Sequence, residues 1–212
     1  MMSESVGSPS CRLWLLGDSN PARWQNDIAS PLDPRHPARH SIWTPVLDYA
    51  QDRLYRKSGL RLDTSLLYIR NAVANPALKP KNDQPNWPEP VLHSVGDLAS
   101  LLQQFTPVVL ISFGSFAFEA ARRACHEQPA RCVRYWTTSR LGDEFRLRSV
   151  PSPRASIVLP LLHASIARRH FLKSHTAFSG KGANYFETTG HAVADILLRY
   201  RQEPSLWVPR GG

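Results

Sequence analysis

The chain has 212 residues, which is enough for one domain with a sizeable core and cramped for two, so we expect a single domain over 1–212. Its formal net charge of +9 indicates a polyanionic partner such as nucleic acid or an acidic membrane surface, although a solvated basic surface would also explain it. Three cysteines without a CxxC pair argue against a disulfide framework and a metal site, and the lack of a signal-like start or a membrane-length apolar run predicts a cytoplasmic protein.

Four short apolar runs do not alternate with polar residues, which predicts strands buried on both faces, as in a parallel sheet. These runs are LWLL (13–16), SLLYI (65–69), VVLIS (108–112) and SIVLPLL (156–162). Apolar residues at helical spacing predict helices at 43–58, 94–105, 114–127 and 187–202. Strands that alternate with helices predict an α/β fold, a three-layer α/β/α sandwich around a mainly parallel four-stranded sheet.

The remaining segments are expected to be irregular. Proline-rich stretches at 30–41 and 75–90 predict long loops, and the ends at 1–10 and 204–212 predict loose tails. Loops of this length inside a compact domain are often functional, so both loops are candidates for substrate contacts.

Each predicted strand ends in small or polar residues that suit ligand binding. The first strand runs into the segment 17–21 (GDSNP), the second into 70–71 (RN), the third into 113–115 (FGS) and the fourth into 163–165 (HAS). Ligands of open α/β sheets bind at the carboxyl ends of the strands. If the strands are parallel, these four groups meet at one edge of the sheet.

The segment LLGDSN (15–20) resembles the opening block of the GDSL (SGNH) hydrolases. That resemblance implies Ser19 as a nucleophile, with Asn71 and Gly114 as oxyanion-hole contributors. A serine nucleophile needs a base and a group that orients the base. The late Asp-x-x-His of that family is missing, because no histidine of the C-terminal third follows an acidic residue by three positions. A serine hydrolase therefore stands as the alternative function.

Taken together and in order, the four strand ends resemble the uracil-DNA glycosylase superfamily. The segment 17–21 is similar to its Gly-x-Asp-Pro loop, with one more residue between glycine and proline. The segment 66–87 is similar to its strand that ends in asparagine before a proline-rich loop, and 107–121 to its third strand and helix. The segment 157–171 resembles its strand ending in His-Pro-Ser, with alanine in place of the proline.

The resemblance implies a monofunctional DNA glycosylase that flips a pyrimidine base out of DNA and hydrolyses its N-glycosidic bond without a metal or cofactor. It assigns His163 to the departing base, where a preformed donor lowers the barrier. Asp18 or Asn20 would hold the water, and the extra loop residue leaves this choice open. Asn71 would read the base edge. A turn asparagine and a core histidine are the plainer interpretations of Asn71 and His163.

The other candidates follow from the same resemblance. Further contacts to the base are expected from Gly17, Ser19, Ala22, Trp43 and Phe113. Contacts of a monomer to double- or single-stranded DNA are expected from Lys79, Lys81, Ser115, Ser165, Ile166, Arg168 and Arg169. Ile166 would act as a wedge in the base stack, and the two arginines would hold phosphates, although a solvated arginine pair would also explain them.

The substrate is suggested by Ala22, the residue after the first-motif proline. Uracil-specific members of the superfamily carry a tyrosine there, which blocks the C5 side of the pyrimidine. Alanine implies an open C5 side, and hence thymine or a hydroxymethylated or glucosylated cytosine of phage DNA, beside uracil. The role would then be antiviral defence or DNA repair. Because the first and last motifs deviate, a catalytically weak nucleic-acid-binding relative is a third interpretation.

Overall fold

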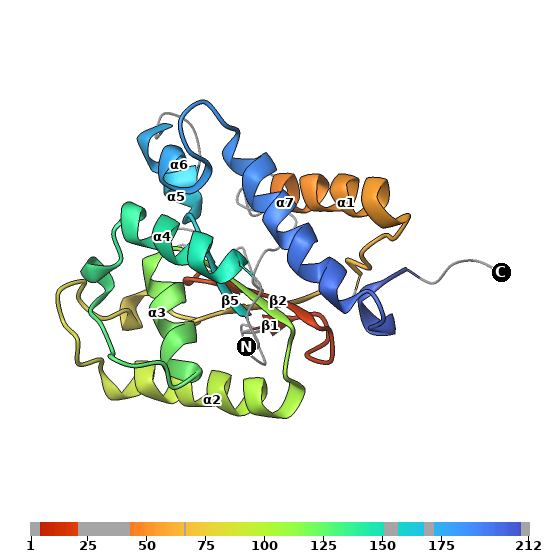
Figure 1. The fold of residues 1–212 in the computed structure, drawn as a ribbon. Helices are drawn as coiled ribbons and strands as arrows, with labels where there is room; N and C mark the ends of the chain where they lie inside the picture. The colour runs from red at the N-terminus through yellow and green to blue at the C-terminus, as the bar shows by residue number, and fades with distance from the viewer. Residues whose placement is uncertain (1–4, 21–42, 66, 151–156, 168–171, 209–212) are drawn as a thin grey trace.

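The computed structural model describes residues 5–20, 43–65, 67–150, 157–167 and 172–208. These residues form an α/β fold around a five-stranded sheet with the order β1-β3-β2-β4-β5 (Figure 1). The strands are Ser5–Val6 (β1), Leu13–Gly17 (β2), Tyr68–Asn71 (β3), Val109–Phe113 (β4) and Ile157–Leu161 (β5). Strands β2 to β5 are parallel, and β1 pairs antiparallel with β3 at the edge.

Four parallel strands are confirmed at the apolar runs, although β3 begins only at Tyr68 within the run 65–69, and the prediction of a four-stranded sheet is wrong by one strand. The two-residue β1 lies in a segment that we expected to be a loose tail. A strand of two residues, one of them polar, has no periodicity that a sequence can reveal. Its main-chain pairing with β3 covers what would otherwise be the open edge of the sheet.

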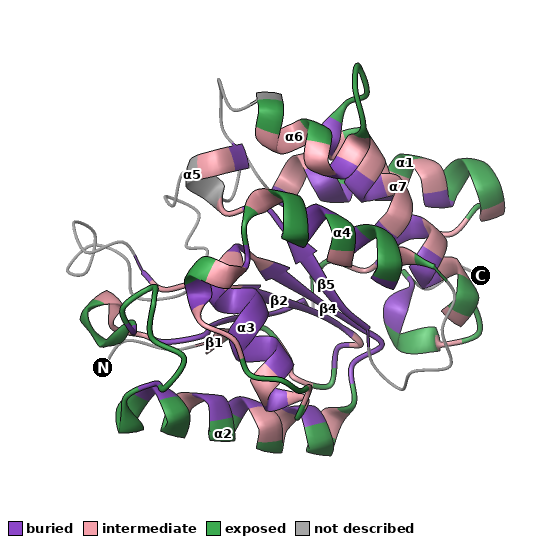
Figure 2. Ribbon diagram, turned by 60° about the vertical axis from the view of Figure 1, so that its left-hand side comes forward, coloured by how far each residue is buried: buried purple, intermediate pink, exposed green. Residues whose placement is uncertain are grey.

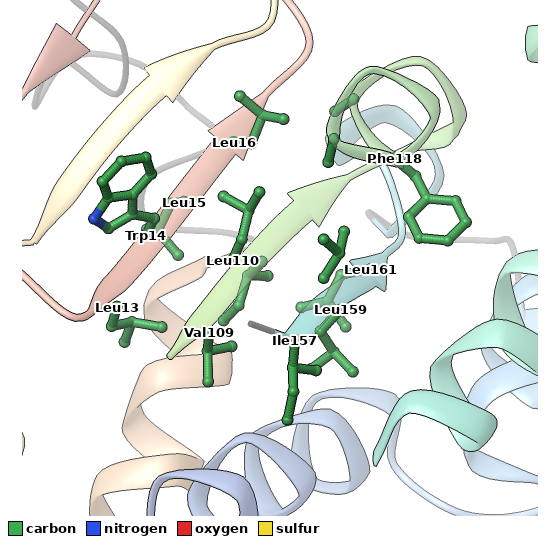
Figure 3. Close-up of a cluster of buried hydrophobic side chains, with 14 of the residues drawn as sticks. Leu13, Trp14, Leu15, Leu16, Val109, Leu110, Phe118, Ile157, Leu159 and Leu161 are labelled. Atoms are coloured by element: carbon green, nitrogen blue, oxygen red, sulfur yellow. The ribbon is translucent and has the colours of Figure 1, made fainter. Parts of the chain in front are cut away.

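The middle of the sheet is excluded from solvent on both faces, which explains the continuous apolar runs. Every residue in 13–16 and in 109–111 is at most 1% exposed. Figure 3 shows these side chains together with those of β5 and with Phe118 from the neighbouring helix. A strand covered on both faces has no solvent side for a polar residue, so the sequence does not alternate.

Helices lie on both sides of the sheet (Figure 1). On one side are α1 (Thr44–Ser58) and α7 (Tyr185–Leu197), and on the other are α2 (Glu89–Phe105) and α3 (Ser115–Ala124). Near the edge strand β5 lie α4 (Thr138–Ser149), α5 (Ala164–Ala167) and α6 (Leu172–Ser179). Short 3-10 turns occur at Pro76–Leu78, Val133–Tyr135, Leu198–Tyr200 and Pro204–Leu206. Helix α3 is buried along most of its length, whereas α2 carries alternating buried and exposed bands (Figure 2).

Three segments differ from their predicted structure. Helix α2 begins at Glu89 and not at 94, because a proline in the first turn of a helix lacks only a hydrogen bond that would be absent anyway. Helix α4 was not predicted, since arginines and a glycine interrupt its apolar stripe. The end of the chain is not loose as far as Val208, because Leu206 is fully buried and Trp207 forms a bridge with Leu62.

The topology places a crevice at the carboxyl ends of the central strands. The chain goes from β2 outward to β3, and then returns past β2 to β4 on the opposite side. Ligands of open α/β sheets bind where the strand order reverses in this way. Across the described ranges, no helix has both the length and the apolar character needed to cross a bilayer.

Candidate active site

The parallel register brings the predicted strand ends to one edge of the sheet. Gly17 at the end of β2 pairs with Asn71 at the end of β3, and Phe113 at the end of β4 pairs with Leu161 of β5. The main chain stays hydrogen-bonded just beyond the strands, where the Gly114 amide donates to the Leu161 carbonyl at 2.8 Å. The segments that follow the four strands therefore begin close together at one edge of the sheet.

A cavity of about 220 Å³ opens at this edge of the sheet. Its lining includes residues from the ends of β2, β4 and β5. Five of the residues predicted from the sequence line it: Asp18, Lys79, Ser115, His163 and Ile166. The sequence did not point to Pro80, Phe116 and Val133, which also line it, because they are apolar residues without a motif.

Asp18 presents a carboxylate whose two oxygens have different surroundings. Its Oδ2 lies 3.1 Å from the Lys79 Nζ and 3.7 Å from the His163 Nε2. Its Oδ1 is buried and has no hydrogen-bond partner among the described residues. Buried acceptors are nearly always paired in proteins, so this oxygen is an exception, and the contacts of the carboxylate to the cavity run through Oδ2.

His163 is an accessible side chain and not a core histidine. Its side chain is 39% exposed and lies across the cavity lining from Asp18. The main chain fixes its position, because the His163 carbonyl accepts hydrogen bonds from Ile166 and Ala167 at 2.9 Å each. Gly114 passes against it with φ of 94°, and a Cβ on Gly114 would lie 2.8 Å from the His163 Cβ. Only glycine fits this left-handed, crowded position.

Asn20 and Asn71 form a buried pair below the cavity. The Asn71 Nδ2 donates to the Asn20 Oδ1 at 2.8 Å, and Asn71 is 8% exposed while Asn20 is 3% exposed. A Cβ on Gly17 would lie 2.4 Å from the Asn71 Oδ1, so the first-motif glycine makes room for this amide. Neither Asn20 nor Asn71 is among the described residues that line the cavity, so the structure does not place Asn71, the predicted reader of the base edge, in its lining.

Helix α3 starts at the cavity, with Ser115 and Phe116 in the lining. The first turn of a helix has unpaired amides and a partial positive charge, which favours nearby negative charge. The Ser115 Oγ donates to the Trp136 carbonyl at 2.7 Å, so this hydroxyl is used in fixing the helix start. Ser115 therefore contributes its main chain to the cavity lining, because its hydroxyl is already bonded to Trp136.

Other predicted residues lie away from the cavity. Ser19 is partly exposed, and no hydrogen bond within the described part of the chain joins its hydroxyl to a histidine. Trp43 is 8% exposed at the start of α1, so the structure places it in the core and not in a base pocket. Phe113 is half-buried at the end of β4 and packs against the core. Lys81 is exposed on the loop after β3.

Some predictions fall outside what the structure describes. Ala22, Arg168, Arg169 and the predicted loop 30–41 lie outside the described residues, and Ser165 is described only as part of α5. Within the described ranges, no group of three or more histidine, cysteine, aspartate or glutamate side chains could hold a metal ion.

The arrangement suits hydrolysis by acid–base and electrostatic catalysis. A carboxylate with one unpaired oxygen, an accessible imidazole and a lysine share one small cavity at the start of a helix. The carboxylate can hold a water or stabilise a cation, and the imidazole can donate a proton or a hydrogen bond. The sequence matches no protein-family model, and a search of curated proteins finds no similar sequence, so the function must be argued from this site.

Proposed function

We propose that the protein is a monofunctional DNA glycosylase and a divergent member of the uracil-DNA glycosylase superfamily, which hydrolyses the N-glycosidic bond of a flipped pyrimidine. The observation that carries this proposal is the shared cavity of Asp18 and His163 at the point where the strand order reverses. Breaking an N-glycosidic bond makes a cationic sugar and an anionic base. The cavity holds a group of the right kind for each.

In this proposal, the Asp18 carboxylate, which lines the cavity, holds the attacking water. Its negative charge also stabilises the positive charge that develops on the sugar. Lys79 donates to the Asp18 Oδ2 at 3.1 Å, which fixes the orientation of the carboxylate. His163 donates to the departing base, and the positive end of α3 adds to the stabilisation of its negative charge.

Asn20 and Asn71 have a different task in this proposal. Asn20 anchors the Asn71 amide and so positions the loop that carries Asp18. Asn71 is the reader of the base edge, for which its amide keeps a second N–H and its Oδ1 while it stays bonded to Asn20. This assignment gives Asp18, and not Asn20, the water.

The proposed partner is DNA, bound by a monomer. The net charge of +9 favours a polyanion, and Ile166 lines the cavity mouth where a wedge would enter the base stack. Arg168 and Arg169 follow it in the chain as the proposed phosphate contacts. Ala22 supports a pocket open toward C5 of the base, and thus a role in removing C5-modified phage bases or in DNA repair.

The test is excision from matched duplexes that carry uracil, thymine, 5-hydroxymethylcytosine or its glucosylated form, read as alkali-labile abasic sites. We expect Asp18→Asn and His163→Ala each to lower the single-turnover rate by about 10²-fold or more while DNA binding is retained. The matched controls are Asp97→Asn and His93→Ala, since His93 and Asp97 form a similar pair at 3.8 Å on the exposed surface of α2.

Two outcomes would contradict the proposal. One is a wild-type protein that leaves every base in place, and the other is full activity in both site variants. Loss of activity in Asn20→Ala with full activity in Asp18→Asn would give the water to Asn20. Hydrolysis of p-nitrophenyl acetate that is lost in Ser19→Ala would favour the serine hydrolase instead.

A further inference from the structure

A second cavity, of about 460 Å³, adjoins the candidate active site. The two cavities share Asn82, Ser115 and Val133 in their linings, so they are neighbours across these three residues. Asp83, Arg134 and Trp136 line only the second cavity. A group held in the first cavity therefore has a preformed space beside it.

The wall between the cavities is held by contacts between distant parts of the chain. The Arg134 amide donates to the Asn82 carbonyl at 2.7 Å, which ties the loop after β3 to the turn before α4. Arg123 donates to the Pro85 carbonyl at 2.7 Å, and its guanidinium lies 3.8 Å from the centre of the buried Trp87 ring. The loop beside the second cavity is thus anchored at several points.

The lining of the second cavity combines an acidic side chain, a basic side chain and a neutral amide. Asp83 and Arg134 are exposed, and neither has a side-chain hydrogen bond or ion pair to another described residue. The Asn82 amide offers both a donor and an acceptor. The floor includes Trp136, whose indole nitrogen already donates to Glu119 at 2.7 Å and so leaves the ring as an apolar surface.

This combination selects among ligand classes. An anion would be repelled by Asp83 and a cation by Arg134, while an apolar group would desolvate both charges without replacing their hydrogen bonds. A neutral group with many hydroxyls satisfies the carboxylate with its donors and the guanidinium with its acceptors. The volume lies in the range of ordinary ligand sites, about 300–1,000 Å³.

We propose that the second cavity is a subsite for a neutral, polyhydroxylated substituent, such as a hexose, carried by the base that occupies the first cavity. This inference rests on the proposed glycosylase function and deepens it. The enzyme would not only leave room for a substituent at C5 of the base but would bind that substituent. Asp83 and Arg134 are its specificity-determining residues. They bind the substituent and leave the bond cleavage to Asp18 and His163.

The experiment compares kcat/KM for a glucosylated 5-hydroxymethylcytosine with that for uracil in otherwise identical duplexes. We expect wild type to favour the glucosylated base. Asp83→Ala and Arg134→Ala should each lower the ratio of the two kcat/KM values by about tenfold, the effect of removing one hydrogen bond to the substituent. Asp83→Trp, which fills the cavity, should lower it further. Gln84→Ala is the matched control, because Gln84 is exposed on the same loop and lines neither cavity.

The outcomes separate the subsite from the glycosylase function. A protein that removes uracil, but whose ratio is unchanged in Asp83→Ala, Arg134→Ala and Asp83→Trp, would overturn the subsite alone. A protein that removes none of the bases would overturn both proposals. Equal loss of both activities in the variants, together with a lower melting temperature, would show that Asp83 and Arg134 only support the loop, and would also overturn the subsite.

Discussion

Replacing Gly17 with alanine tests the packing beneath the candidate site. The new methyl group would lie 2.4 Å from the Asn71 Oδ1, well inside any normal contact, so the amide of Asn71 has to move. Movement breaks the 2.8 Å hydrogen bond to Asn20 and leaves two buried amides without their partner. A buried polar group left unpaired costs about 1–3 kcal/mol.

We therefore expect Gly17→Ala to lower the free energy of unfolding by about 2–3 kcal/mol. For a protein of this size, each 1 kcal/mol shifts the melting temperature by about 2–4 °C, so the expected loss is about 4–12 °C. Thermal unfolding followed by circular dichroism measures the shift. Base excision should fall in the same variant, because the displaced amide disturbs the loop that carries Asp18.

The same substitution at Gly96 is the matched control. A Cβ at Gly96 meets nothing within 4 Å in the middle of α2, so alanine should stabilise the helix by about 1 kcal/mol. The Asn71→Ala background isolates the contact, because the new methyl group then has no amide to displace. If Gly17→Ala costs as much in that background as in the wild type, the clash with Asn71 is not the cause and the reasoning is refuted.

Three further predictions concern charge. Burial alone would raise the pKa of Glu127, but the hydrogen bonds and charges of Arg148 and then Arg122 together outweigh it and lower the pKa below the ordinary 4.5. The advantage of wild type over Glu127→Gln in urea unfolding should thus be full above about pH 4.5 and disappear as the pH falls through the lowered pKa; a constant difference would contradict this. Burial, and then the nearby Glu127 charge, raise the pKa of the Cys125 thiol to about 11, so its alkylation rate in the folded protein should keep rising with pH beyond 9, and a plateau near 9 would be the opposing result. Replacing Arg168 and Arg169 with alanine should reduce the slope of log affinity against log salt by about 0.9 for each DNA phosphate that these side chains neutralise, and an unchanged slope would place the phosphate-binding residues elsewhere.

The parallel strands could be predicted from sequence because a strand that is buried on both faces consists of consecutive apolar residues. Each apolar run became a strand, and the small or polar residues after β2, β4 and β5 contribute to one cavity. The convergence of Asp18 and His163 followed from the parallel direction alone, since carboxyl ends of parallel strands share an edge. The choice of these two residues came instead from the resemblance of 17–21 and 157–171 to superfamily motifs.

Other features depend on contacts that a sequence does not express. The second cavity lies where the Arg134 amide binds the Asn82 carbonyl, and main-chain hydrogen bonds place no demand on residue type. Helix α4 buries Arg148 among its core-facing residues, where the ion pair with Glu127 compensates the charge. An arginine at such a position breaks the apolar periodicity on which helix prediction relies.

The first loop shows how the structure separates two residues that the sequence left as alternatives. Asp18 lines the cavity, where its Oδ2 lies near Lys79 and His163, whereas Asn20 is buried and bound to Asn71. With one more residue between the glycine and the proline, the loop provides both a group toward the substrate side and an anchor toward the interior. The anchor needs an uncharged acceptor, because a buried carboxylate paired with an amide would lack compensation for its charge. In the proposed reaction the outward group needs the charge, because an amide stabilises a developing cation less well than a carboxylate does. The order of acid and amide in this loop therefore follows from what each position demands.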